Sequence, residues 1–285
     1  MRILVVDDDR VTLHLVRGLL VAEGFDVETA NDATEALEKA SRTSFDLLVV
    51  DVWMPGMSGF DFLARLRSKG PTPRVLILTA DDAPETMLRA VGEQAYRYLS
   101  KPVEPRELVE AVNAALESPP LPRPIEVLSA RPEWVELLVP CDIEAAERTR
   151  NFMSQLDAEL PDDVRESVGA AFHELLRNAV EWGGKLDPTA SVRIACIRSP
   201  RMILYRISDP GQGFHFEELR HAAVSNPDDQ PLQHLEEREK LGMRAGGYGL
   251  MLTRSLVDEL LFNEKQNEVL FVKYLEGRPA SKSGQ

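Results

Sequence analysis

The sequence predicts two domains, a doubly wound parallel α/β domain followed by an α+β domain built on an antiparallel sheet. Three observations support this prediction. In the first 117 residues, short runs of Val, Ile and Leu alternate with amphipathic helical patterns, which is typical of a parallel sheet covered on both faces. A segment with four prolines in seven residues then interrupts every periodicity. The remainder mixes helical patterns with strand runs joined by a turn.

The first domain is expected to span residues 1–117 and to hold five strands. The apolar runs predict strands at Ile3–Val6, Leu47–Val50, Val75–Leu78 and Tyr96–Leu99. The amphipathic patterns predict helices near Val11–Glu23, Ala33–Ala40, Phe60–Arg67, Glu85–Val91 and Arg106–Leu116. Strands alternating with helices in this way indicate a doubly wound topology.

The proline-rich segment predicts an extended, fairly stiff linker over residues 118–133. A second domain is expected over residues 134–276, with strands at Trp134–Val139, Val192–Ile197, Met202–Ser208 and Val269–Leu275. Its expected helices are Ile143–Leu160, Asp162–Trp182 and Leu250–Leu260, with Pro161 as the first helical residue of the second. The polar stretch His221–Lys240 is expected to be a mobile lid, and residues 277–285 a flexible tail.

Composition narrows the class of protein. Of the 285 residues, 44% are hydrophobic and 28% charged, which is ordinary for a soluble globular chain. The net charge of −14 argues against direct binding to nucleic acid. The two cysteines, Cys141 and Cys196, are isolated in sequence, so a reducing cytoplasm is expected. No apolar run reaches the ~18 residues that span a membrane, and no signal peptide is expected.

Polar side chains follow four of the predicted strands, where doubly wound sheets collect their function. Asp7 and Asp8 end the first strand, and Asp51 ends the third. Thr79 ends the fourth strand and Lys101 follows the fifth. Carboxylates brought together repel one another unless they bind a cation, and a hard ion such as Mg²⁺ prefers oxygen ligands. Lys101 can pair with the cluster, and Thr79 can hydrogen-bond a transferred oxyanion.

This order resembles the receiver domain of two-component response regulators, which has the flavodoxin-like topology. The resemblance covers roughly residues 1–117, including the run Asp-Val-Trp-Met-Pro-Gly at 51–56. It implies that Asp51 accepts a phosphoryl group as an aspartyl phosphate. It also implies that Asp7, Asp8 and the Trp53 carbonyl hold Mg²⁺ together with Asp51.

The same resemblance implies further roles around the predicted site. Thr79 and Lys101 are expected to bind the phosphoryl oxygens, and the Lys101-Pro102 bond is expected to be cis. Tyr98 is expected to be the aromatic residue that turns inward when Thr79 moves. The chain departs from the family at residues 92–96, Gly-Glu-Gln-Ala-Tyr, where a Gly-Ala pair is usual. Asp9 is expected only to cap the helix that follows.

Three segments of the second domain carry a different set of chemical groups. In the first, Glu174 and Asn178 are four residues apart, so both lie on one face of a helix. An acid beside a neutral amide suits a base next to a metal ion. Residues 209–214, Asp-Pro-Gly-Gln-Gly-Phe, and residues 246–250, Gly-Gly-Tyr-Gly-Leu, allow close backbone approach to phosphates. A Walker lysine motif is absent from the sequence, so this is not a P-loop protein.

The ordered trio resembles the N box and the two glycine boxes of the Bergerat-fold (GHKL) ATPases, which are α+β sandwiches. Within that superfamily, residues ~134–275 look most like the anti-sigma-factor serine kinases. The resemblance makes Glu174 the candidate base for a substrate serine or threonine. Asn178 is the candidate Mg²⁺ ligand, and Asp209 the acceptor for the adenine amino group of ATP. The candidate glycines of the ATP site are Gly211, Gly213, Gly246, Gly247 and Gly249.

Together these patterns predict a cytoplasmic, bacterial two-component response regulator whose receiver domain controls an ATP-binding serine/threonine protein kinase. Expected partners are an upstream histidine kinase or phosphotransfer protein, an anti-anti-sigma-like antagonist or a sigma factor, and a second copy of the chain. Two alternatives stay open: nucleotide-dependent capture of a partner without kinase activity, and an atypical histidine kinase that acts on a separate protein. His173 is not the expected phosphoacceptor, because it lies in the predicted ATP-binding helix.

Overall fold

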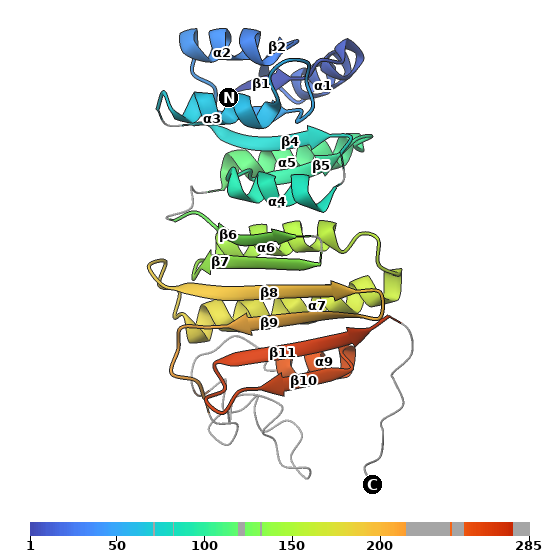
Figure 1. The fold of residues 1–285 in the computed structure, drawn as a ribbon. Helices are drawn as coiled ribbons and strands as arrows, with labels where there is room; N and C mark the ends of the chain where they lie inside the picture. Colours follow the sequence, from blue (N-terminus) through green and yellow to red (C-terminus); the bar gives the residue numbers. More distant parts are fainter. Residues whose placement is uncertain are drawn as a thin grey trace. The chain divides into compact units, whose positions relative to one another are not determined.

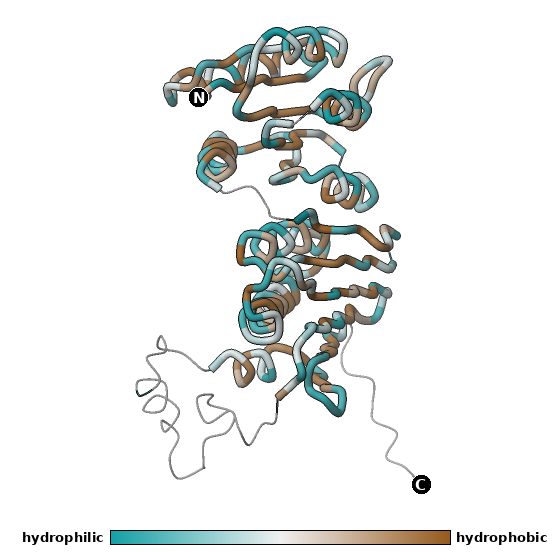
Figure 2. Tube along the Cα trace, turned by 90° about the vertical axis from the view of Figure 1, so that its left-hand side faces the viewer, coloured by the Kyte–Doolittle hydropathy of each residue, from teal (hydrophilic) through white to brown (hydrophobic). Residues whose placement is uncertain are grey.

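The chain forms two compact units, Met1–Pro120 and Leu121–Gln285. The computed structural model describes residues 1–70, 72–81, 83–118, 123–131, 133–214, 240 and 248–275. Each unit has its own sheet and helices (Figure 1). Hydrophobic residues run along the strands of both sheets (Figure 2), so each unit has its own core. Among the described helices, none is long and apolar enough to cross a membrane.

The N-terminal unit contains a parallel five-stranded sheet in the order β2-β1-β3-β4-β5. Its strands are β1 (Arg2–Val6), β2 (Asp26–Ala30), β3 (Leu47–Val50), β4 (Arg74–Thr79) and β5 (Arg97–Ser100). Its helices are α1 (Arg10–Ala22), α2 (Ala33–Arg42), α3 (Gly59–Arg67), α4 (Pro84–Gly92) and α5 (Pro105–Glu117). The predicted doubly wound fold is confirmed. The strand order reverses at β1 and β3, whose carboxyl ends therefore border the crevice where such sheets bind their ligands.

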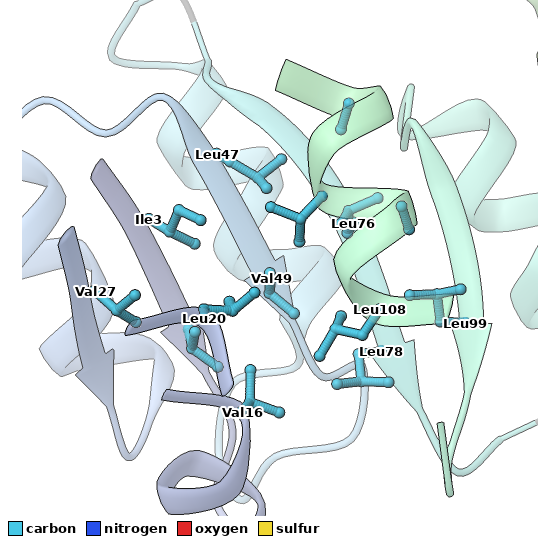
Figure 3. Close-up of a cluster of buried hydrophobic side chains, with 14 of the residues drawn as sticks. Ile3, Val16, Leu20, Val27, Leu47, Val49, Leu76, Leu78, Leu99 and Leu108 are labelled. Atoms are coloured by element: carbon cyan, nitrogen blue, oxygen red, sulfur yellow. The ribbon is translucent and has the colours of Figure 1, made fainter. Parts of the chain in front are cut away.

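One face of this sheet packs against α1 and α5 (Figure 3). Ile3, Val49 and Leu78 lie in the same buried cluster as Leu20 of α1 and Leu108 of α5. All four residues of β3 are buried, as expected for a strand covered on both faces. The edge strand β2 has the sequence Asp-Val-Glu-Thr-Ala; because it is partly polar, the pattern of apolar runs does not predict its position.

The C-terminal unit contains an antiparallel six-stranded sheet in the order β10-β11-β9-β8-β7-β6. Its strands are β6 (Glu126–Arg131), β7 (Trp134–Pro140), β8 (Ser191–Ser199), β9 (Met202–Ser208), β10 (Glu259–Phe262) and β11 (Glu268–Tyr274). Its described helices are α6 (Ile143–Leu156), α7 (Asp162–Asn178) and α9 (Gly249–Leu256), and a π-helical turn, η1 (Ala179–Gly183), continues α7. The helices lie on one side of the sheet (Figure 2). This arrangement confirms the predicted α+β sandwich.

Aromatic packing fixes α7 on this sheet. Tyr205 of β9 is fully buried, and its ring stacks on Phe271 of β11 with centroids 5.1 Å apart. Phe172 of α7 contacts the same ring at 4.9 Å. The Tyr205 hydroxyl donates a hydrogen bond to Asp157, the residue that ends α6, at 2.9 Å. The C-terminal turn of α7, which carries two predicted site residues, is therefore held by the core of the unit.

Several element predictions for this unit are corrected by the structure. Glu126–Arg131, part of the predicted linker, forms β6, a polar edge strand paired with β7 and interrupted by a bulge. The helix predicted at Leu250–Leu260 ends at Leu256, and Glu259–Phe262 is a strand. A short apolar run does not distinguish the two by periodicity alone. Pro161 is the N-cap of α7 and not its first residue. The predicted lid, apart from Lys240, and the predicted tail lie outside the described residues.

Candidate functional site

The predicted strand-end residues of the N-terminal unit meet at one edge of the sheet. Lys101 extends its ammonium group between two carboxylates, with Nζ 2.6 Å from Asp51 Oδ2 and 2.6 Å from Asp7 Oδ2. Thr79 at the end of β4 is fully buried, and Asp8 is exposed. Because β1, β3, β4 and β5 are parallel and adjacent, their carboxyl ends bring these side chains together.

Charge in this cluster is only partly balanced. Asp7 is 2% exposed, and burial raises the pKa of its carboxyl, although hydrogen bonds from Lys101 and from the Asp9 amide oppose this. Burial alone would lower the pKa of Lys101, but its hydrogen bonds with Asp51 and Asp7 dominate and raise it. Lys101 therefore stays protonated and supplies one positive charge among three carboxylates, so the cluster can accept a further positive charge.

The three carboxylates fit a divalent cation. One oxygen from each of Asp7, Asp8 and Asp51 can be chosen so that all lie within 4.8 Å of one another. Oxygen ligands of this kind suit Mg²⁺. The loop after β3 also folds over Asp51, because the Trp53 amide lies 3.3 Å from Asp51 Oδ1 as a hydrogen-bond donor. This brings the Trp53 backbone, whose carbonyl was the fourth predicted ligand, to the cluster.

Two residues of this site were not among the predicted site residues. A side chain at Gly59 would collide with the Asp51 carbonyl, since a Cβ there would lie 2.0 Å from the oxygen. Asp81 accepts a hydrogen bond from the Trp53 indole at 2.8 Å and another from the Ala83 amide at 2.9 Å, at the N-terminus of α4. In the sequence, the indication that Asp81 belongs to the site is its position two residues after Thr79.

Two finer predictions for this unit concern the segment around β5. The Lys101-Pro102 peptide bond is cis, as predicted. Tyr98 is fully buried, so its ring lies in the inward position. At the departure from the family pattern, Gln94 adopts a left-handed backbone with φ of 53° immediately before Ala95. Gln94-Ala95 therefore occupies the turn where the resemblance implied Gly-Ala.

In the C-terminal unit, Glu174 and Asn178 share one face of α7. The Asn178 amide Nδ2 lies 3.3 Å from Glu174 Oε1 as a hydrogen-bond donor. Gly249, the first residue of α9, packs directly on this acid, because a Cβ there would lie 1.8 Å from Glu174 Oε1. The Thr253 hydroxyl is buried and donates to the Gly249 carbonyl at 2.9 Å, which holds the first turn of α9 in place.

Asp209 lies after β9 and is partly buried between two glycines. The Gly211 amide donates to Asp209 Oδ1 at 2.8 Å. A Cβ on Gly183 would lie 2.2 Å from Asp209 Cγ, and one on Gly211 would lie 2.7 Å from Oδ1. Burial raises the pKa of Asp209, with the Gly211 amide opposing it. Gly183 ends the π-helical turn that continues from Asn178, so η1 joins the Glu174–Asn178 pair to Asp209.

The structure describes the whole of the first glycine segment and only residues 248–250 of the second. Gly213 has a φ of 84°, and a Cβ there would lie 1.5 Å from the Lys265 carbonyl oxygen. Gly246 and Gly247 lie outside the described residues. The structure therefore joins Glu174 and Asn178 with Gly249, and joins Asp209 and Gly211 with Gly183. Gly183 was not a predicted site residue, although the Gly183-Gly184 pair at the end of the helical run was visible.

Comparisons with known proteins agree with this division. Residues 3–113 match the response regulator receiver domain, and residues 139–273 match the histidine kinase-like ATPase domain. Response regulator MprA of Mycobacterium leprae is 41% identical over 116 residues, 41% of this chain and 51% of that protein. Probable transcriptional regulatory protein TcrX of Mycobacterium tuberculosis is 40% identical over 114 residues, 40% of this chain and 49% of that protein. The chain thus spans about half the length of these curated relatives.

Among solved structures, the chemotaxis protein CheY4 of Vibrio cholerae is 35% identical; the match covers 40% of this chain and 98% of that one, with a TM-score of 0.39. The two family matches define the class of the protein as one that combines these two kinds of domain. The N-terminal unit therefore contains a response regulator receiver domain, and the C-terminal unit contains a histidine kinase-like ATPase domain.

Proposed function

We propose that this regulator is phosphorylated on Asp51 and that its ATPase domain is an ATP-dependent serine/threonine protein kinase. One observation carries the kinase half of the proposal. Oε1 of the Glu174 carboxylate accepts a hydrogen bond from the Asn178 amide, and Gly249 packs against the same oxygen. The candidate base and the candidate metal ligand thus lie against the start of α9, although α9 is about 70 residues away in the sequence.

In the receiver domain, Asp51 is the proposed nucleophile. Its carboxylate oxygen attacks the phosphorus of a phosphohistidine donor, the phosphorus–nitrogen bond breaks, and the imidazole leaves. Lys101 already contacts Asp51 and stabilises the added negative charge on the phosphoryl oxygens. Thr79, at the end of the neighbouring strand β4, would donate its hydroxyl to one of them. Mg²⁺, held by Asp7, Asp8 and Asp51, would supply the remaining charge neutralisation.

In the ATPase domain, Glu174 is the proposed general base. It takes the proton of a serine or threonine hydroxyl on a partner protein. The hydroxyl oxygen attacks the γ-phosphorus, the bond to the β,γ-bridging oxygen breaks, and ADP leaves. Asn178 would offer its side-chain oxygen to Mg²⁺, and Asp209 would accept a hydrogen bond from the adenine amino group. Gly211, Gly213 and Gly249, with Gly246 and Gly247, would let the backbone approach the nucleotide.

The proposed setting is the cytoplasm of a bacterium. The donor to Asp51 is a histidine kinase or a phosphotransfer protein. The partner of the ATPase domain is an anti-anti-sigma-like antagonist protein or a sigma factor, and phosphorylation of Asp51 changes how strongly ATP or that partner is bound. A net charge of −14 makes DNA an unfavourable direct ligand.

The first test is Mg-ATP binding by calorimetry, on the wild type and on Asn178→Ala, each with and without a phosphoryl mimic at Asp51. We expect metal-dependent binding to the wild type, loss in Asn178→Ala, and a change in affinity with the mimic. Absence of binding in every state would overturn the nucleotide proposal. Equal affinity with and without the mimic would mean that Asp51 does not control ATP binding.

A second test addresses phosphoryl transfer itself. With labelled ATP and candidate antagonist proteins, we expect acid-stable phosphoserine or phosphothreonine, and we expect Glu174→Ala to lose transfer while it retains ATP. If Glu174→Ala bound the partner as the wild type does and neither protein transferred phosphate, the domain would be a nucleotide-dependent capture module. Acid-labile product on a histidine would indicate an atypical histidine kinase.

A further inference from the structure

The turn between β10 and β11 lies directly against the loop that carries Asp209. The Asp209 amide donates to the Asn267 carbonyl at 2.9 Å. The Asn267 side-chain amide in turn donates to the Gly211 carbonyl at 3.1 Å. Two residues further along the loop, Gly213 packs on the Lys265 carbonyl. The backbone of the Asp209 loop is therefore held at Asp209, Gly211 and Gly213 by one short turn.

The orientation of the Asn267 side chain is itself fixed. Asn263 Nδ2 donates to Asn267 Oδ1 at 2.8 Å, so the Asn267 oxygen is engaged and its amino group is directed to Gly211. Asn263 Oδ1 also accepts from the amides of Asn267 at 3.1 Å and Glu268 at 3.2 Å. The turn closes through Gln266, whose left-handed φ is 58°. Asn263 thus stabilises the turn, and Asn267 connects the turn to the loop that carries Asp209.

We infer that Asn267 is a positioning residue for adenine recognition: it holds the Asp209 loop so that the carboxylate presents its oxygens to the base. The inference rests on the proposed nucleotide function of Asp209. The carboxylate is held from its own loop by the Gly211 amide, and the Gly211 carbonyl is held by Asn267. Loss of that donor frees the carbonyl side of Gly211, the residue whose amide orients Asp209.

The test is Asn267→Asp, which keeps the shape and the acceptor oxygen but removes the donor to Gly211. Asn113→Asp, an exposed residue of α5 in the other unit, introduces the same charge as a matched control. In Asn267→Asp we expect ATP affinity to fall about tenfold, as for loss of one well-placed hydrogen bond. We also expect the preference for ATP over GTP to shrink toward that of Asp209→Asn, with the melting temperature close to that of the control.

A double-mutant cycle separates positioning from a general structural effect. If Asn267 acts through Asp209, Asn267→Asp should have little further effect on selectivity in the Asp209→Asn background. A purely structural role would weaken ATP and GTP binding equally and add to the effect of Asp209→Asn. Either equal weakening or additivity would overturn the inference.

A nucleotide-free measurement keeps the two proposals distinguishable. Hydrogen exchange of the amides of Asp209 and of residues 211–213 should be faster in Asn267→Asp than in the wild type and in the Asn113→Asp control. Faster exchange in a protein that binds no ATP would leave the supporting role of Asn267 intact and overturn the nucleotide function. Unchanged exchange, or ATP binding and selectivity equal to those of the wild type, would overturn the role of Asn267.

Discussion

The receiver site and the ATPase site position their carboxylates in opposite ways. In the receiver site, a side-chain cation does this: Lys101 contacts Asp7 and Asp51 at 2.6 Å each. In the ATPase site, the backbone does it: Gly249 packs on Glu174, and Gly183 packs on Asp209. The first site should therefore respond most to changes in charge, and the second to the addition of a single methyl group.

The largest effect expected from this contrast is that of Gly249→Ala. Its Cβ would lie 1.8 Å from Glu174 Oε1, so the carboxylate or α9 must move. A displacement on the scale of an ångström at a catalytic group costs about 100-fold in rate, so we expect a loss of that order in phosphoryl transfer. The measurement is initial rate with labelled ATP, at a saturating concentration of the protein substrate.

Gly169→Ala is the matched control for that substitution. Gly169 lies in α7, the same helix as Glu174, and a Cβ there meets nothing within 4 Å. Replacing a helical glycine by alanine in open space should stabilise the protein by about 0.5–1 kcal/mol and leave transfer unchanged. Equal activity of Gly249→Ala and Gly169→Ala would show that Glu174 tolerates movement, and the contrast between the sites would fail.

The receiver site should instead respond to a cation. Because Asp7, Asp8 and Asp51 outnumber Lys101, bound Mg²⁺ should stabilise the folded state, by about 2.7 kcal/mol at 100 times the dissociation constant. Thermal melts of the wild type should shift upward with Mg²⁺, and those of Asp51→Asn far less. Asp46→Asn, which alters an exposed acid outside the cluster, should respond as the wild type does. Equal shifts in all three proteins would mean that the ion binds elsewhere.

The sequence was most informative where chemistry sits at strand ends. Asp7, Asp51 and Thr79 follow apolar runs, so the parallel topology alone predicts that they meet, and the structure brings them together. The pairing of Lys101 with these carboxylates is predictable from its opposite charge. By contrast, the bond between the Trp53 indole and Asp81 depends on the path of two loops, for which no periodicity exists in the sequence.

Prediction was weaker in the second unit because its site depends on backbone contacts between distant segments. The spacing of Glu174 and Asn178 is a local helical property, and it was predicted. The contacts of Gly183 with Asp209 and of Asn267 with Gly211 form only when η1, β9 and the β10–β11 turn come together. Glycine and asparagine are common in turns, so nothing in the sequence distinguishes Gly183 and Asn267 from ordinary turn residues.

Asp209→Asn should separate recognition from stability. Burial raises the pKa of Asp209 above its ordinary 3.8, so the folded protein binds that proton more tightly than the unfolded chain does. The ionised carboxylate therefore destabilises the fold at neutral pH, and this cost disappears as the pH falls toward 3.8. We expect Asp209→Asn to melt at a higher temperature at pH 7, while ATP affinity falls about tenfold with loss of the charged acceptor.

The pH dependence provides the check on that prediction. The difference in melting temperature between Asp209→Asn and the wild type should shrink as the pH is lowered from 7 toward 4. ATP affinity of the wild type should fall over the same range, because the protonated carboxyl accepts a hydrogen bond poorly. A difference in melting temperature that grew on acidification would mean that the charged form is the stabilising one, and that Asp209 has a cation nearby.

The smallest expected effect lies in the receiver domain, where two helices end in the same geometry with different residues. After α1, the amides of Gly24 and Phe25 donate to the carbonyls of Val21 and Leu20, with Gly24 at φ 87°. After α4, the amides of Gln94 and Ala95 donate to Val91 and Ala90, with Gln94 at φ 53°. Both are left-handed caps, which favour glycine.

Exchanging the two cap residues tests backbone conformation separately from packing. Gln94→Gly relieves the left-handed strain of about 1 kcal/mol but adds backbone freedom to the unfolded chain, so we expect a net gain of about 0.5 kcal/mol. Gly24→Gln should add the same strain and restrict the unfolded chain, for a net loss of about 0.5 kcal/mol, because a Cβ at Gly24 meets nothing within 4 Å. Urea unfolding measures both. A loss in Gln94→Gly would show that the Gln94 side chain, whose Nε2 lies 3.3 Å from the Val91 carbonyl, stabilises the turn by more than its backbone strain costs.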